Sequence, residues 1–137
     1  MPCPASTIVG TAVANTPLLS QPLSGKVYLV QGIKYEHGAL VHTLPTLLVA
    51  LRGQIAIDLR AQTSVNREEQ LVTNFPTIPD AGISKFTMKI NGGKKGILVI
   101  TGQGRTICGK KQITTATLQG QSGKIKSSNI TMPTSCK

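Results

Sequence analysis

The chain is divided by glycine and proline into short stretches rich in β-branched residues, and this pattern is the strongest constraint on its fold. The 137 residues include 16 Thr, 13 Ile and 9 Val. These side chains are stiff at χ1 and pack well on a pleated surface, so they favour strands over helices. Alternation is clearest in residues 84–90, where Phe86, Met88 and Ile90 would face one way and the residues between them the other.

Strands are predicted wherever such a stretch is bounded by turn residues. The sequence Asn91-Gly-Gly93, for example, supplies the positive φ angles that hairpin turns need. Helix signals are weak, and a short helical turn is expected only around residues 64–70. The predicted strands are Thr7–Ala14, Lys26–Val30, Leu47–Arg52, Gln54–Arg60, Glu69–Phe75, Ser84–Ile90, Gly96–Thr101, Gln112–Gln119 and Lys124–Thr131.

This spacing predicts an all-β fold, namely an antiparallel β-sandwich of Ig-like or Greek-key type with about eight or nine strands. A length of 137 residues suits one domain, so residues 1–137 are expected to form a single module. The longest apolar run, 47–51, is too short to cross a bilayer. The start of the chain has neither the basic nor the apolar region of a signal peptide, so we expect either a cytosolic chain or a fragment of a longer secreted one.

The positive charge is concentrated at one end of the chain. Residues 1–84 hold five basic and five acidic side chains, whereas residues 85–137 hold ten basic side chains and no acidic one. A one-sided basic surface attracts polyanions, although a run of charge also serves simply as a solvated face. The candidate anion-binding residues are Lys85, Lys89, Lys94, Lys95, Arg105, Lys110, Lys111, Lys124 and Lys126.

Residues 104–110 match the pattern G-x-x-x-x-G-K of a phosphate-binding loop. The next residue is Lys111, where a P-loop needs Ser or Thr to reach the magnesium ion. The residues that follow are β-branched and favour a strand, whereas a P-loop leads into a helix. The pattern therefore does not predict a nucleotide site.

Cys108 has a second interpretation, which depends on the turn at Gln121-Ser-Gly123. If these residues form a three-residue hairpin loop with Gly123 in the left-handed region, Gly120 pairs with Lys124, and paired residue numbers add to 244. Cys108 then lies opposite Cys136. We expect a Cys108–Cys136 disulfide, the alternative being two unrelated cysteines.

Several phrases along the chain form a recognisable set: "CPASTIVGTAVANTPLL", "PLSGKVYLV", "LPTLLVALRGQIAIDL", "FPTIPDAGISKFTMKINGGKKGILV", "GQSGK" and the closing "SC". In these phrases the chain resembles a module of large secreted surface proteins of actinobacteria and related bacteria. The family shows Leu-Cys at 107–108, Asn at 122 and Gly-Cys at 135–136, where this chain has Ile-Cys, Ser and Ser-Cys. The resemblance implies a secreted, modular parent protein with no established activity, and a Cys3 that pairs upstream of this segment or not at all.

Candidate catalytic and metal-binding residues are few. His37 and His42 lie close together beside Glu36, but a zinc site usually needs three or four protein ligands, and two surface histidines are the simpler interpretation. No G-x-S-x-G nucleophile motif is present. Acid–base catalysis needs two acids in one cleft, and Asp58 and Asp80 would meet only by chance. We therefore expect a non-enzymatic protein with no metal and no cofactor.

The first functional hypothesis is a structural or adhesive module of an extracellular bacterial surface protein, with neighbouring modules as its partners. The alternative is a polyanion-binding module that uses the basic C-terminal half, with an anionic wall polymer favoured over nucleic acid. Nucleic acid is less favoured because the basic half has a single aromatic residue, Phe86, for stacking bases, and it faces away from Lys85 and Lys89. A third hypothesis is self-assembly through exposed edge strands.

Overall fold

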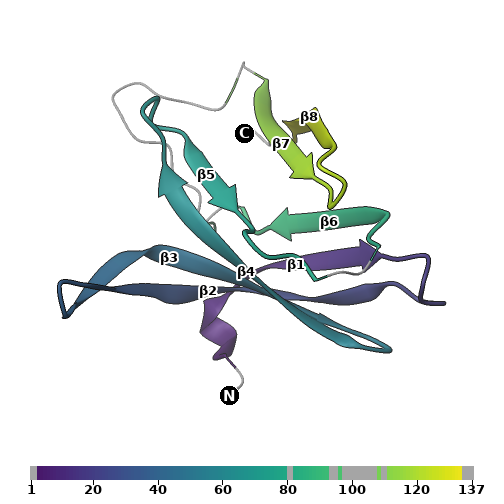
Figure 1. The fold of residues 1–137 in the computed structure, drawn as a ribbon, viewed down its shortest axis with the longest axis horizontal. Helices are drawn as coiled ribbons and strands as arrows, with labels where there is room; N and C mark the ends of the chain where they lie inside the picture. Colours follow the sequence, from purple (N-terminus) through teal and green to yellow (C-terminus); the bar gives the residue numbers. More distant parts are fainter. Residues whose placement is uncertain (1–2, 80–81, 93–95, 97–107, 109–110, 134–137) are drawn as a thin grey trace. The chain divides into compact units, whose positions relative to one another are not determined.

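The computed structural model describes residues 3–79, 82–92, 96, 108 and 111–133 (Figure 1). The chain divides into two compact units, Met1–Ile97 and Leu98–Lys137. Each unit is described by itself below.

The first unit is a strongly curled antiparallel sheet with the strand order β5-β4-β3-β2-β1-β6. Strands β1 to β5 follow one another as a meander, and β6 then returns to pair with β1, the kind of return that a Greek key uses. A short 3-10 helix precedes the sheet. The elements are η1 (Ala5–Thr7), β1 (Ile8–Asn15), β2 (Leu23–Glu36), β3 (Ala39–Arg52), β4 (Ala56–Val65), β5 (Leu71–Asn74) and β6 (Lys85–Ile90).

The core of this unit lies on one face of the sheet and is built from aliphatic side chains. Along β4, Ile57, Leu59 and Ala61 are buried while Asp58 and Arg60 between them are exposed, as the alternation predicts. Ile55, by contrast, precedes β4 and is 45% exposed. Among the described residues no polar or charged side chain is buried. The buried residues are Val9, Ala12, Ala14, Leu23, Val27, Leu47, Val49, Leu51, Ile57, Leu59 and Ala61.

Partly buried side chains from the later part of the unit close this core. Met88 and Ile90 of β6 pack against it, as the alternation in residues 84–90 predicts. Phe75 also packs there and meets Phe86 edge to face, with ring centroids 6.4 Å apart and planes at 74°. Ile83, at the other end of the connection between β5 and β6, also packs against the core, so this connection contributes to the core from both of its ends.

Strands β2 and β3 are much longer than predicted. Each has 14 residues and they form one hairpin, whereas the predicted strands ended at Val30 and began at Leu47. The hairpin closes at His37-Gly38, where φ is 49° and 79°. Positive φ at both central residues is the mark of a type I′ turn. Residues 35–42, which lie between two of the predicted strands, therefore form the tip of this hairpin.

Glycines allow close backbone approach between β2 and β3. A Cβ atom at Gly25 would collide with the carbonyl oxygen of Ala50, and one at Gly32 with the carbonyl oxygen of Leu44. The register of β2 and β3 shifts between Val30 and Gly32, so a β-bulge interrupts the hairpin there.

The β4–β5 connection is a tight turn organised by Asn66, not the helical turn expected around residues 64–70. The Asn66 Oδ1 atom accepts hydrogen bonds from the amides of Glu68 and Gln70, at 3.0 and 2.9 Å. The backbone N–H of Asn66 donates to the backbone carbonyl oxygen of Gln70 at 3.0 Å. Asn is favoured in turns for such bonds to its own backbone.

The second unit contains a two-stranded antiparallel hairpin, β7 (Gln112–Gln119) and β8 (Ile125–Met132). Its pairs run from Gln112 opposite Met132 to Gln119 opposite Ile125, and every pair adds to 244. Gly123 has φ of 83° and Gly120 bonds to Lys124, so the predicted three-residue loop and register are confirmed. The strand predicted at Gly96–Thr101 lies, apart from Gly96, outside the described residues.

The all-β, antiparallel class is confirmed, whereas the Ig-like sandwich is not. The described strands form one curled sheet and one hairpin. The expectation of a single module over residues 1–137 stays a prediction. In the described ranges, no helix has the length and apolar character of a membrane span.

Candidate functional site

The predicted anion-binding residues fall into three groups. Lys85 and Lys89 lie on β6 in the first unit. Lys111, Lys124 and Lys126 lie in the second unit. Outside the described residues lie Lys94, Lys95, Arg105 and Lys110.

In the first unit, strand pairing brings a third lysine onto the face that carries Lys85 and Lys89. Thr11 of β1 lies between Lys89 on one side and Lys26 of β2 on the other. Two strand spacings separate Lys26 from Lys89, a backbone distance of about 10 Å, and Lys85 lies about 13 Å along β6 from Lys89. All three lysines are exposed. We call these three residues the basic face.

The basic face is opposite to the core. Met88 and Ile90, which alternate with Lys89 along β6, pack against the buried cluster. Phe86, 39% exposed, lies on that same side, so no aromatic ring of β6 accompanies the lysines. Tyr28, two residues from Lys26 along β2, shares the side of the lysines but is only partly exposed, so the face attracts anions mainly by charge, the mode that loses affinity as salt is added.

One acidic residue borders the basic face and is already engaged. Asp58 lies two strands from Lys26, with Ala50 between them. Its Oδ1 atom accepts a hydrogen bond from Arg52 Nη1 at 2.8 Å, and both side chains are about half exposed. An ion pair this exposed contributes at most about 1 kcal/mol. Its main effect here is to neutralise the carboxylate nearest the basic face.

The lysines of the second unit do not gather in the same way. Lys126 pairs with Leu118 near the loop of the hairpin, and Lys124 precedes β8. Lys111 precedes β7 at the other end, about 25 Å away for a strand of this length. Two of the three lysines thus lie at the loop and one at the open end.

Polar and exposed aliphatic side chains lie on both faces of the β7–β8 hairpin. On one face Thr115 Oγ1 donates to Asn129 Oδ1 at 2.9 Å, and the Thr117 and Ser127 hydroxyls lie 3.0 Å apart. The same face also carries Ile113 and Ile125, and the opposite face carries Leu118 and Ile130, all of them more than half exposed. Cross-strand hydroxyl pairs of this kind stabilise a ribbon that buries little apolar surface.

A groove of about 580 Å³ crosses the outer face of β2, β3 and β4, and the segment after β5 forms one wall. Arg60 lies at this groove and makes no ion pair with any residue that the structure describes. The sequence did not predict the groove, because its wall comes from a connection far along the chain. Its lining residues are Val30, Gln31, Gly32, Ile33, Thr46, Asp58, Arg60, Gln62, Pro76, Thr77 and Pro79.

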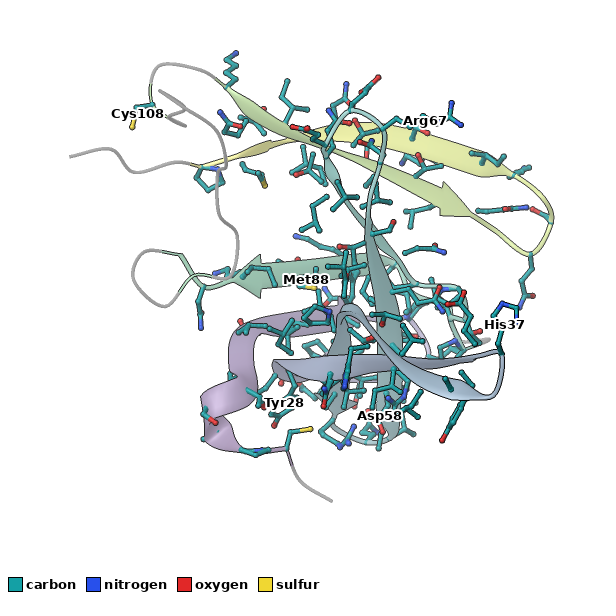
Figure 2. The ribbon with its side chains drawn as sticks, turned by 90° about the vertical axis from the view of Figure 1, so that its left-hand side faces the viewer. Tyr28, His37, Asp58, Arg67, Met88 and Cys108 are labelled. Atoms are coloured by element: carbon teal, nitrogen blue, oxygen red, sulfur yellow. The ribbon has the colours of Figure 1, made fainter. Side chains whose placement is uncertain are left out.

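The two histidines are not arranged as metal ligands. His37 is at the tip of the β2–β3 hairpin, away from the sheet (Figure 2). The His42 Nδ1 atom lies 2.7 Å from Gln31 Nε2, an amide hydrogen bond to the ring. Across the described part of the chain, no three His, Cys, Asp or Glu side chains gather as a metal site.

The predicted disulfide depends on a residue that the structure does not describe. Cys108 is exposed in the second unit (Figure 2), while Cys136 lies outside the described residues, so their pairing stays a prediction. The same holds for the P-loop-like segment, of which only Cys108 is described before Lys111. Cys3 is a half-buried free thiol. Asp80, weighed as a partner for Asp58, is also outside the described residues.

No protein-family model matches the sequence, and comparison with curated proteins and with solved structures finds no match. The resemblance to modules of secreted bacterial surface proteins therefore stays a prediction.

Proposed function

We propose that the chain is a non-enzymatic structural and adhesive module of an extracellular bacterial surface protein. The observation that carries the proposal is that the first unit has a packed core on one side and an extended hairpin beside it. Aliphatic side chains fill the core, and a hairpin of two 14-residue strands extends from the sheet. An architecture of this kind holds a rigid sheet and presents exposed side chains from it, which suits spacing and display.

Localisation tests this proposal. Antibody against the chain should label intact cells of its source, and external protease should degrade the parent protein without lysis. A matched cytosolic marker must stay protected in the same experiment. Recovery of the parent protein only from the cytosol would disprove the extracellular role.

The second candidate function is binding of an anionic wall polymer, and the basic face favours it. This face carries Lys26 of β2 and Lys85 and Lys89 of β6, the two strands that pair with β1. The nearby carboxylate of Asp58 accepts a hydrogen bond from Arg52. Three lysine contacts to phosphate predict that log Kd changes with log salt concentration with a slope of about 2–3.

Two triple variants with the same loss of charge test this candidate. Lys26, Lys85 and Lys89 are changed to Gln in one variant, and Lys111, Lys124 and Lys126 are changed to Gln in the other. Binding to immobilised polyglycerol phosphate at low salt should fall much further in the first variant. Equal losses would show that net charge alone is responsible, and tighter binding to DNA than to polyglycerol phosphate would favour nucleic acid.

A further inference from the structure

The outer half of the β2–β3 hairpin is a two-stranded arm. β1 pairs with β2 as far as Tyr28, and β4 pairs with β3 only from Leu47 onward. Beyond the bulge at Gly32, residues 32–36 pair with residues 39–43, and neither segment pairs with any other strand that the structure describes. Figure 1 shows this end of the hairpin extending past β1 and β4. We call residues 32–44 the arm.

A two-stranded ribbon is marginal in water, and a third strand stabilises it. The arm also carries exposed apolar side chains on one face, where Tyr35 pairs with Leu40 and Ile33 with His42. Tyr35, Leu40 and Ile33 are 77%, 51% and 48% exposed. Both the backbone and the side chains of the arm thus favour a further strand beside it.

The edges of the first unit differ in how well they resist such pairing. The β6 edge carries Lys85 and Lys89, and β5 has only four residues. The outer edge of β2 in the arm carries the charged residue Glu36. Charge and shortness are the usual protections of an edge strand. The outer edge of β3 has neither, because Ala39–Leu44 reads ALVHTL, without charge, Gly or Pro.

We propose that the β3 edge at Ala39–Leu44 pairs with the same edge of a second copy of this chain. Antiparallel pairing of a segment with itself is a two-fold arrangement, so each copy supplies the strand that the other lacks. The product is a four-stranded sheet, β2-β3-β3-β2, of two arms. This pairing is independent of the proposed function, since a monomeric chain could still be a surface module.

The hydrogen-bond pattern of the hairpin selects the register. The pair that flanks a two-residue turn is hydrogen-bonded, here Glu36 and Ala39, and bonding alternates along the strands. Leu40 and His42 therefore direct their backbone N–H and C=O groups away from β2. A two-fold axis at Val41 places Leu40 opposite His42 of the partner subunit, and the two equivalent pairs exchange four hydrogen bonds.

Sedimentation equilibrium of the full chain tests the proposal. The expected mass is twice 14.4 kDa. His42→Pro removes an outward N–H group and should raise the dissociation constant by roughly tenfold or more, because two of the four bonds are lost. His42→Ala loses the bond to Gln31 but keeps the N–H group, so it should remain dimeric. Circular dichroism shows whether both variants are folded.

Cross-linking tests the register in a Cys3→Ser background. Val41 and its symmetry mate would have Cα atoms about 4.5 Å apart, within the disulfide range of about 4.4–6.8 Å. Val41→Cys should therefore give a covalent dimer on oxidation, and Thr43→Cys should not. A monomer at every concentration, a folded His42→Pro variant with unchanged association, or equal cross-linking of both cysteine variants would overturn the proposal.

Discussion

The backbone amide of Gly120 donates a hydrogen bond of 2.8 Å to the carbonyl oxygen of Lys124, and this bond sets the register of the β7–β8 hairpin. If the same register continued past Gln112 and Met132, Cys108 would lie opposite Cys136, which is outside the described residues. Peptide mapping without reductant is expected to recover these two cysteines as one linked pair, with Cys3 as a free thiol. Reduction should lower the free energy of unfolding by about 3–4 kcal/mol for a loop of this size. Free thiols at both positions would contradict the pairing.

Gly123 should tolerate substitution poorly for conformational reasons alone. Its φ is 83°, and no atom lies within 4 Å of the Cβ position, so space is not the limit. A Gly123→Val change should destabilise the hairpin by about 1–2 kcal/mol, because β-branched residues avoid the left-handed region. Gly120→Val is the control, since Gly120 has no positive φ and its nearest atom is 3.8 Å away. Amide exchange of β7 and β8 measures both.

The hairpin of the second unit was predictable because neighbouring residues in the sequence determine its register. The loop Gln121-Ser-Gly123 determines the pairing, and every pair from Gln112 to Gln119 follows from it. The alternation along β6 is local too, which is why the sides taken by Lys85 and Lys89 were predicted.

The β2–β3 arm was missed because its sequence signals are ambiguous. Gly32 and Pro45 suggest breaks, yet Gly32 lies at a bulge within one continuous pair of strands and Pro45 lies inside β3. The turn at His37-Gly38 places a histidine at positive φ, where residues other than glycine are uncommon. Lys26 joined the basic face only through its pairing with β1, a long-range relationship that spacing along the chain does not reveal.

The core of the first unit predicts a large cost for truncating Leu51. Its side chain is fully buried beside Val27 and Val49. Leu51→Ala should lower the free energy of unfolding by about 2–5 kcal/mol, from lost burial and the cavity left behind. Leu18→Ala is the matched control, because Leu18 is 74% exposed. Urea unfolding measures both, and a similar midpoint for the two variants would show that Leu51 is not part of the core.

The turn at Asn66 allows its acceptor and donor bonds to be separated. The Oδ1 atom accepts from the amides of Glu68 and Gln70, and Nδ2 donates to Gln70 Oε1 at 3.0 Å. Asn66→Ala removes all three bonds and should destabilise the first unit by about 1–3 kcal/mol. Asn66→Asp keeps an acceptor oxygen for both amides and loses only the exposed bond to Gln70, so most of the stability should return.

Because β5 has only four residues, the loss in Asn66→Ala should appear first as faster amide exchange at Leu71–Asn74. Equal destabilisation by Ala and Asp would mean that the side-chain donor, and not the two amide bonds, holds the turn.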